Sequence, residues 1–385
     1  MEALRCTIMR GGTSKAIFLR EEDLPPPGPE RDRIVLRVFG SPDRRQIDGL
    51  GGADPLTSKM AIIGPPRVPN ADVTYTFGQV EIDRPHVDYH SLCGNISAAV
   101  GHYAIESGLV EAAEGVTRVR AWTTNLKRML TIEVPVKNGK PVAPGTYRVP
   151  GVPGTGARIL IDFSDTAGGA TGALLPTGNP VDTLDVPGAG PIQVSLVDIG
   201  NAHVFIRARD AGMTGTETPA EIDANPELLD RLERIRAAGA VRMGMASSIA
   251  AARSETPATP IIGMISPPAA YIGHLDGVKV AAEDVDLVAR LLFMQISHKT
   301  YAGTSTVCTG VAARIPGTLV AEAARAGAGG RKELRIGHPA GVIETEAEVV
   351  LSGPDRNHGV RRATLGRTAR RILDGTVYID TDTTI

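Results

Sequence analysis

The sequence predicts an α+β fold in which many short strands surround a few helices, and three observations support this. Hydrophobic residues make up 42% of the 385 residues, which is enough to bury a substantial core. The 44 glycines and 28 prolines favour short strands joined by tight turns over a bundle of helices. Each half of the chain also contains a helix of small residues that begins after a glycine and a polar residue, at Cys93-Gly94-Asn95 and at Ala302-Gly303-Thr304. We therefore expect two similar lobes, each with a central helix inside a cage of strands.

The first lobe is expected to begin with two strands, a helix and a polar loop. A strand over 3–9 ends at Gly11-Gly12, and a second strand follows at 16–19. The proline-rich stretch at 24–30 leads into an apolar helix around 31–39. Beyond a Gly-rich loop at 44–58 the remaining elements are strands and one buried helix. We place the strands at 59–63, 72–82, 86–89, 116–136, 142–149 and 157–163, and the helix at 93–110.

The second lobe is expected to follow a stretch rich in Gly, Pro, Thr and Asp. This composition shift, near 176–191, places the domain boundary between residues 185 and 186, so the lobes are 1–185 and 186–385. We expect helices at about 219–238, 283–297 and 302–315, and strands at 192–199, 260–265, 333–336, 341–351 and 360–366.

The charge and cysteine content exclude several classes of protein. The net charge is −2, which gives no reason to expect nucleic-acid binding. The three cysteines are far apart and lack the spacing of a zinc site. We see neither a signal-peptide segment nor a run of about 18 apolar residues that would span a membrane. These observations indicate a cytoplasmic protein without a membrane segment, and they leave a homodimer open.

The densest basic stretch of the chain lies near the C-terminus. It admits two interpretations, a solvated face or a surface that attracts an anionic substrate. The fingerprints of dinucleotide-binding, nucleophilic-serine, zinc-protease and calcium-loop proteins are missing from the sequence, so we expect neither a cofactor nor a metal. The arginines of this stretch are Arg356, Arg361, Arg362, Arg367, Arg370 and Arg371.

Two residues could transfer protons. Cys93 stands at the start of a predicted helix, where exposed N–H groups and the helix dipole lower the pKa of a thiol; the alternative is a buried structural cysteine. Lys59 stands where a polar loop becomes an apolar strand, and desolvation there would free a neutral amine; the alternative is a solvated charge. Cys6 and Cys308 fall within a strand and a helix, so we assign both to the core.

Several turns could bind an anion or serve only as turns. The stretch from Arg10 to Lys15 reads RGGTSK, in which two glycines, hydroxyls and cations could form a carboxylate or phosphate cradle. The N–H groups of Gly94 and Asn95 could bind a carboxylate at the helix start. The turns at 200–203 (GNAH) and 337–341 (GHPAG) could supply an amide, imidazoles and N–H groups.

Taken together, these motifs resemble the PrpF family, which includes methylaconitate isomerases, methylitaconate Δ-isomerases and 4-oxalomesaconate tautomerases. The resemblance runs from about residue 4 to residue 380. It implies the diaminopimelate-epimerase fold, with two similar lobes, each a curved, mostly antiparallel sheet around a helix, and a site in the cleft between them. The last strand of such folds can return to the first lobe, so the resemblance allows the segment 367–385 to pack there. The matching motifs are RGGTSK at 10–15, GSPD at 40–43, RQIDGLGGA at 45–53, LTSK at 56–59, CGN at 93–95, GVPG at 151–154, LLPTG at 174–178, IPGT at 315–318, HP at 338–339 and RTAR at 367–370.

The resemblance implies roles for particular residues. Lys59 and Cys93 correspond to the proton-transfer pair. Diaminopimelate epimerases carry a second thiol at the second helix start, where this chain has Ala302, so a two-thiol racemase mechanism is disfavoured. The stretch at 200–203 resembles the GNPH element of epimerases, with Ala202 in place of proline. The residues that we expect to bind substrate are Arg10, Thr13, Ser14, Ser58, Gly94, Asn95, Asn201, Gly303, Thr304 and His338.

We therefore expect an isomerase that needs no cofactor and moves a proton, and with it a double bond, along a small unsaturated di- or tricarboxylate. The stretches at 71–80 and 87–89 look closest to the oxalomesaconate branch, so 4-oxalomesaconate ranks first. Aconitate-type and methylitaconate-type acids rank second. Two other classes stay open, an accessory partner of an aconitase-like dehydratase and an amino-acid racemase.

Overall fold

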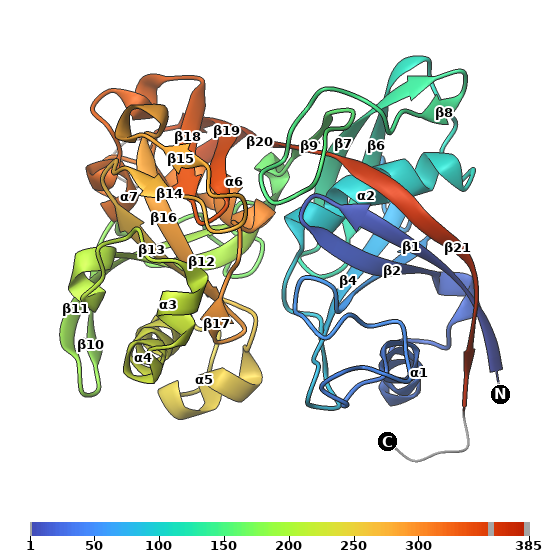
Figure 1. Cartoon of the computed structure of the whole chain (residues 1–385), viewed down its shortest axis with the longest axis horizontal. Helices are drawn as coiled ribbons and strands as arrows, with labels where there is room; N and C mark the ends of the chain where they lie inside the picture. Colours follow the sequence, from blue (N-terminus) through green and yellow to red (C-terminus); the bar gives the residue numbers. More distant parts are fainter. Residues whose placement is uncertain (1, 353–357, 381–385) are drawn as a thin grey trace. The chain divides into compact units, whose positions relative to one another are not determined.

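The structure is a computed structural model that describes residues 2–352 and 358–380, and the chain forms two compact units within it (Figure 1). The first unit comprises 1–161 and 367–385, and the second comprises 162–366. The first boundary therefore differs from the boundary at 185 expected from composition. Polar loop residues after 162 belong to the second unit because they bond to it, as when Gly168 N–H donates to the Asp198 carbonyl at 2.8 Å.

The first unit is built on one run of hydrogen-bonded strands. Strand β21 pairs with β1, and the run continues through β2, β3, β4, β6 and β7; the pairs β2–β3 and β4–β6 are parallel, and the others are antiparallel. Its strands are β1 (Glu2–Gly11), β2 (Ser14–Arg20), β3 (Lys59–Gly64), β4 (Val73–Val80), β5 (Val87–Asp88), β6 (Gly115–Thr123), β7 (Arg128–Lys137), β8 (Lys140–Pro141), β9 (Ile159–Asp162) and β21 (Ala369–Ile379).

The two α-helices of the first unit lie on opposite faces of these strands. Helix α2 (Gly94–Glu106) packs against β1, β6, β7 and β21 and is buried along its length except for Glu106, as its small residues predict (Figure 1). Helix α1 (Pro29–Phe39) covers the other face, where Leu36 and Phe39 join the core formed by Ile17, Met60 and Ile62. A short 3-10 helix, η1 (Glu21–Asp23), follows β2. Alternate residues of β2, β3 and β4 therefore face α2, which is the face that carries Lys59.

The second unit repeats this strand order. From β11 the run passes through β12, β13, β16, β18 and β19 to β20, with β12–β13 and β16–β18 parallel and the other pairs antiparallel. Its strands are β10 (Asp182–Val186), β11 (Gly190–Ile199), β12 (Asn201–Arg207), β13 (Ile261–Ser266), β14 (Tyr271–Ile272), β15 (Lys279–Val280), β16 (Leu287–Phe293), β17 (Ile296–Ser297), β18 (Glu333–His338), β19 (Gly341–Val350) and β20 (Gly359–Arg367).

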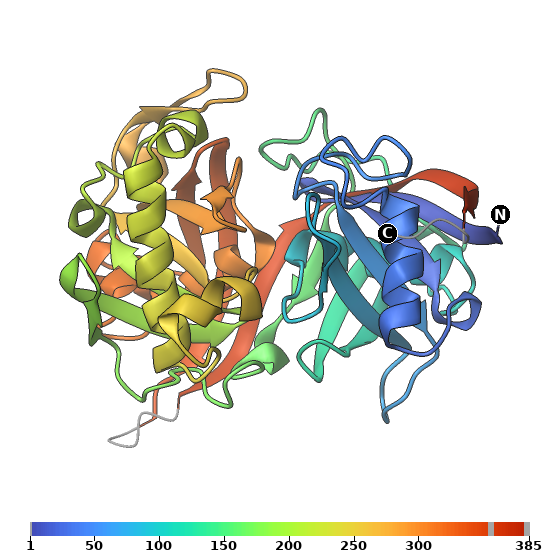
Figure 2. The same cartoon turned by 90° about the horizontal axis from the view of Figure 1, so that it is seen from below.

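Helix α6 occupies in the second unit the place that α2 occupies in the first. It follows β17 as α2 follows β5, and it packs against β11, β12 and β19. Figure 2 shows two further helices of this unit, α4 in yellow-green and α5 in yellow, in contact with each other. The helices are α3 (Pro219–Asp223), α4 (Pro226–Arg242), α5 (Ile249–Glu255), α6 (Gly303–Ala312) and α7 (Leu319–Ala323), with 3-10 turns η2 (Ser164–Thr166), η3 (Ala208–Ala211), η4 (Ala282–Asp284) and η5 (Ala328–Gly330).

One expected helix, at 283–297, is wrong. Residues 287–293 form strand β16, which pairs on both sides and is buried along nearly its whole length. A strand buried on both faces reads as a continuous apolar run, and its sequence, LVARLLF, cannot be told from a buried helix by periodicity.

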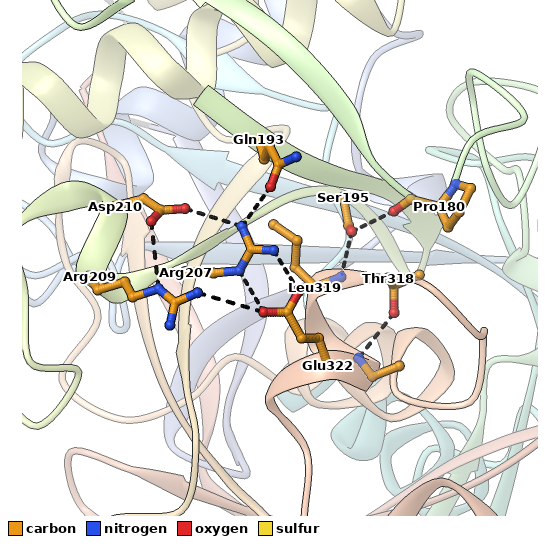
Figure 3. A network of polar contacts seen from close by, with 10 residues as sticks. Pro180, Gln193, Ser195, Arg207, Arg209, Asp210, Thr318, Leu319 and Glu322 are labelled. Carbon is orange, nitrogen blue, oxygen red and sulfur yellow. Dashed lines mark hydrogen bonds and ion pairs between the residues drawn. The ribbon is translucent and has the colours of Figure 1, made fainter. Parts of the chain in front are cut away.

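A polar network ties α7 to the sheet of the second unit (Figure 3). Arg207, the last residue of β12, donates through Nε to Oε1 of Glu322 at 2.8 Å and through Nη1 to Gln193 at 2.9 Å. Ser195 Oγ accepts from Leu319 N–H at 2.9 Å, at the start of α7. This network therefore joins α7 to strands β11 and β12.

Among the residues that the structure describes, no helix is long and apolar enough to span a membrane.

Candidate active site

Lys59 is buried on the inner face of the first unit. It is the first residue of β3, only 3% exposed, and its Nζ donates to Oε1 of Gln79 at 2.6 Å across the β3–β4 pair. Burial lowers the pKa of the amine below its ordinary 10.5, and charges on Cys93 and Asp54 partly oppose the shift. The solvated alternative for Lys59 is therefore excluded. A neutral amine becomes available at lower pH than for an exposed lysine, as a general base requires.

Cys93 stands directly before α2 and is partly exposed, unlike the other two thiols. Its carbonyl accepts from Ser97 N–H at 2.9 Å, so the N–H groups of Gly94 and Asn95 precede the helix's own hydrogen bonds. Charge on Cys93 influences Lys59, as above, and also Tyr75: burial raises the pKa of Tyr75 well above its usual range, and a Cys93 thiolate raises it further. The structure thus brings the two predicted proton-transfer residues together.

The turn between β1 and β2 lies against the first turn of α2. Gly12 has a φ of +49°, and a Cβ there would lie 2.2 Å from Asn95 Oδ1, so only glycine allows this approach. Asn95 Nδ2 donates to Thr13 Oγ1 at 3.0 Å. The Ser14 side chain is 2% exposed, and its Oγ has no hydrogen-bond partner within the described residues. The RGGTSK motif is therefore packed on the helix start that carries the thiol.

Arg367 is the functional candidate that the sequence reasoning missed. Its side chain is 1% exposed, and its Nε donates to Asn95 Oδ1 at 2.7 Å. Burial lowers its pKa to about 10, while Tyr147 and Cys93 act in the opposite direction. The solvated-face interpretation of the C-terminal arginines is therefore wrong for this residue, whereas Arg361, Arg370 and Arg371 are exposed. The family motif RTAR was the available signal; Arg356 lies outside the described residues.

Two residues predicted to bind substrate, Arg10 and Ser58, also form hydrogen bonds within the protein. Arg10 Nη1 donates to the carbonyls of Gly12 and Thr368 and to Thr368 Oγ1, at 2.9–3.1 Å. Ser58 is fully buried; its Oγ donates to the Val80 carbonyl at 2.9 Å and accepts from Gln46 Nε2 at 2.8 Å. The contacts of Arg10 hold the β1–β21 junction, and Ser58 holds the loop before Lys59, while binding of substrate by these two residues stays a prediction.

The Gly-rich loop at 44–58 is held by Gln46, which the sequence did not single out. Its Nε2 donates to Ser41 and Ser58, and its Oε1 accepts from Ala53 N–H at 2.8 Å. Gln79 likewise fixes Lys59, because its Nε2 donates to the Ser58 carbonyl at 3.0 Å while its Oε1 holds the amine. These amides bond across the loop and between strands, so they could not be recognised from local sequence.

The second unit carries a matching turn-to-helix contact at the start of α6. Asn201 Nδ2 donates to Thr304 Oγ1 at 3.1 Å, which reverses the direction of the bond from Asn95 to Thr13 in the first unit. His203 is fully buried, between the Asn201 carbonyl (2.8 Å from Nδ1) and Ser305 Oγ (2.7 Å from Nε2). Burial lowers the pKa of His203 to about 4, so this imidazole is neutral at physiological pH.

His338 and Gly303 also lie near this helix start. His338 ends β18, and its ring centroid is 6.3 Å from that of Tyr301, two residues before Gly303. Ala302 is the structural counterpart of Cys93: its carbonyl accepts from Thr306 Oγ1 at 2.9 Å, just as the Cys93 carbonyl accepts from Ser97 Oγ at 2.9 Å. The predicted residues of the second unit thus gather at one helix start that has no thiol.

The two other cysteines lie in the core, as expected. Burial raises the pKa of Cys6 and raises that of Cys308 well above its usual value, so both thiols stay protonated at neutral pH. Within residues 2–352 and 358–380, no group of three His, Cys, Asp or Glu side chains could hold a metal ion. The two groups predicted to transfer protons, the amine of Lys59 and the partly exposed thiol of Cys93, therefore remain as the pair beside the start of α2 in the described chain.

Comparison with known proteins agrees with this geometry. The model of the PrpF protein family matches residues 1–380. The chain is 52% identical over 375 residues to a 3-methylitaconate isomerase of Eubacterium barkeri, covering 97% of each chain. It is 42% identical to a 2-methyl-aconitate isomerase of Shewanella oneidensis, covering 97% of this chain and 96% of the relative, and 38% identical to a 4-oxalomesaconate tautomerase of Pseudomonas putida, covering 98% and 96%.

Solved structures show the same fold. A crystal structure of a methylitaconate-delta-isomerase superposes with a TM-score of 0.80 at 52% identity, covering 98% of this chain and 96% of that one. A probable proline racemase with a TM-score of 0.57 and 13% identity, covering 98% and 93%, shares the fold alone. The predicted fold class, α+β of the diaminopimelate-epimerase type, is confirmed.

Proposed function

Because the chain belongs to the PrpF family and is an isomerase, we propose that it moves a proton between two carbons of an unsaturated dicarboxylate, with Lys59 and Cys93 as base and acid. The observation that carries this proposal is the buried amine of Lys59, whose pKa is lowered by desolvation and which responds to charge on the neighbouring thiol. One amine, on β3, and one thiol, at the start of α2, suit a shift between two carbons better than inversion at one carbon.

The step is a 1,3-shift that conserves atoms and charge. The neutral amine of Lys59 removes a C–H proton next to the double bond, and the electron pair delocalises into the conjugated carboxylate. Cys93 then donates its proton to the carbon two positions away, which leaves an ammonium and a thiolate. Return of the proton from Lys59 to Cys93 restores the enzyme. Each acid or base contributes on the order of 10²–10⁴ in rate.

The carboxylates would be held at the helix starts. The N–H groups of Gly94 and Asn95 and the Ser14 hydroxyl can stabilise charge that develops on a carboxylate oxygen, which is commonly the largest catalytic contribution. In the second unit we propose the same role for Gly303 and Thr304, with Asn201 and His338 beside them. No metal or organic cofactor is needed for any of these contacts.

We rank a 3-methylitaconate-type acid first as substrate, because the relative of that name shares 52% of its residues with this chain, against 38% for the oxalomesaconate tautomerase. This reverses the order expected from residues 71–80. In such an acid, the carbon between the methyl group and a carboxylate loses its proton and the terminal methylene becomes a methyl. The double bond then lies between the two carboxylate-bearing carbons. 2-Methylaconitate and 4-oxalomesaconate are the second candidates.

Proton NMR in D₂O tests the proposal. The purified protein is mixed in turn with 3-methylitaconate, 2-methylaconitate and 4-oxalomesaconate. With the first acid we expect the vinyl signals to disappear and a methyl that carries solvent deuterium to form. Lys59→Met and Cys93→Ser should each slow this by about 10²-fold or more, while Lys137→Met and Cys6→Ser, which change the same residue types elsewhere in the unit, should not.

Three results would contradict the proposal. If no acid reacts, the chain is not this isomerase, and co-purification of an aconitase-like dehydratase would then favour the accessory role. If an acid reacts but both site variants match the parent, Lys59 and Cys93 are not the base and the acid. Deuterium entry at one carbon without movement of a double bond would instead indicate a racemase.

A further inference from the structure

We propose that Arg367 is a positioning residue of this site, which fixes the Asn95 side chain at the start of α2 and stabilises the thiolate form of Cys93. The inference deepens the proposed function and rests on it for its effect on turnover. It begins from an unusual placement: Arg367 and Arg290 are the two largest side chains that are less than 2% exposed in the described chain.

The first step of the argument is the bond between Arg367 and Asn95. Nε of Arg367 donates to Asn95 Oδ1 at 2.7 Å, and the same amide donates through Nδ2 to Thr13 Oγ1 at 3.0 Å. An amide has one acceptor end and one donor end, so Arg367 sets which end faces the β1–β2 turn. Without Arg367 the amide could rotate and no longer hold Thr13.

The second step is that the backbone holds Arg367 firmly in place. The next residue, Thr368, accepts through its carbonyl from Gly12 N–H at 2.9 Å and from Arg10 Nη1 at 2.9 Å. A Cβ on Gly12 would lie 2.8 Å from Arg367 Cδ, so the arginine stem passes directly over this glycine. The contacts of Arg10 and Gly12, both in the RGGTSK motif, therefore serve to place a distant arginine.

The third step is electrostatic. Among the described residues, charge on Cys93 influences Lys59 on β3, Tyr75 on β4 and Arg367, and Tyr147 in the loop after β8 also influences Arg367. Lys59 must be neutral to act as a base, and burial raises the pKa of Tyr75 well above its usual range. Arg367 is the group in this set that keeps a positive charge throughout the reaction. Because Arg367 bonds to Asn95, two residues after Cys93, its fixed charge lies at the helix start that carries the thiol. A cation at this place favours the thiolate that forms when Cys93 gives up its proton.

Titration of the thiol tests the proposal without any substrate. The rate at which iodoacetamide alkylates Cys93 is followed by mass spectrometry between about pH 6 and 10, in the parent, Arg367→Gln and Arg361→Gln. Cys6 and Cys308 are buried and serve as internal references. We expect Arg367→Gln to raise the apparent pKa of Cys93 by about one unit or more. Arg361 is exposed and pairs with Glu348, so Arg361→Gln should match the parent.

Turnover gives the second readout. Arg367→Gln should lower kcat about tenfold or more, the scale of a misplaced acid. An unchanged Cys93 pKa in a folded Arg367→Gln protein overturns the proposal, whatever its turnover. If that variant does not fold, Arg367→Lys decides: it keeps the charge but lacks Nε, so kcat should fall about tenfold while the thiol pKa stays close to the parent value.

If Arg367→Lys keeps the kcat of the parent, the positioning role of Arg367 is overturned.

The experiments distinguish a failure of the proposed function from a failure of this inference. Alkylation needs no substrate, so Arg367 is tested even if none of the acids reacts. Conversely, a parent protein that isomerises 3-methylitaconate but whose thiol is indifferent to Arg367 keeps the proposed function and removes this inference.

Discussion

Removing the imidazole of His102 should make the first unit resistant to mild acid. His102 lies in the middle of α2, 3% exposed, and burial together with the charges of Arg371 and Arg10 lowers its pKa to about 4. An unfolded histidine titrates near 6.5. The folded pKa is the lower one, so protons bind preferentially to the unfolded chain. The histidine therefore costs no stability above pH 6.5, and stability is lost as the pH falls from 6.5 towards 4.

The size of this loss follows from the two pKa values. At pH 5 the unfolded imidazole is almost fully protonated and the folded one is about one-tenth protonated, which corresponds to about 2 kcal/mol. At pH 7.5 the same relation gives almost zero. Between pH 7.5 and pH 5, the free energy of unfolding of His102→Gln should therefore fall by about 2 kcal/mol less than that of the parent. Any destabilisation that the substitution causes at both pH values cancels in this comparison.

The single tryptophan makes this measurable for one unit. Trp122 lies in β6, against which α2 packs, so its fluorescence during urea unfolding reports the first unit. The matched control is His86→Gln, an exposed histidine in the same unit. If His102→Gln and the parent lose the same stability between the two pH values, His102 is not held neutral in the fold, and the reasoning from its burial is refuted.

Three further predictions concern the site and the scaffold. Gly12→Ala should reduce kcat about tenfold or more, because its Cβ would lie 2.2 Å from Asn95 Oδ1; parental kcat would contradict the tight approach of the turn. Gln79→Leu removes the acceptor of the Lys59 ammonium, so the acidic limb of the kcat/KM–pH profile, where the base loses its neutral form, should move to lower pH by about one unit; an upward shift would show that Lys59 is not the base. A double-mutant cycle of Arg207→Ala and Glu322→Ala, followed by circular dichroism, should give a coupling of about 1 kcal/mol, since the pair is bidentate but Glu322 is half exposed; zero coupling would contradict the network of Figure 3.

Much of the strand framework was predictable because its signals are local. The strand at 59–63 and the helix from 93 follow from apolar runs that are bounded by polar and Gly-rich stretches, and they correspond to β3 and α2. These two elements alone place Lys59 and Cys93 at element ends. The helix predicted at 283–297 was wrong because the strand β16 is covered on both faces. Such a strand lacks the alternation of apolar and polar residues that would distinguish it from a buried helix.

The supporting residues of the site could not be predicted, because long-range pairing decides their environment. Arg367 looks like one more surface arginine until β21 pairs with β1 and carries it to Asn95, 272 positions away in the sequence. Ser58 Oγ bonds to Gln46, twelve positions away, and to the Val80 carbonyl, 22 positions away, and neither partner follows from the sequence around Ser58. In both cases the sequence showed which chemical group the side chain carries, but it did not show which residue would be its hydrogen-bond partner.

The return of β21 to the first unit has a consequence for biosynthesis. The first unit is interrupted by residues 162–366, so about 205 residues are made between its two parts. At roughly 5–20 residues per second, a ribosome needs about 10–40 s for that stretch. During this time β1 lacks its neighbour β21 and the thiol lacks Arg367. The nascent chain must therefore keep an open sheet edge soluble while the second unit is made, and the bond from Arg367 to Asn95 can form only late in synthesis.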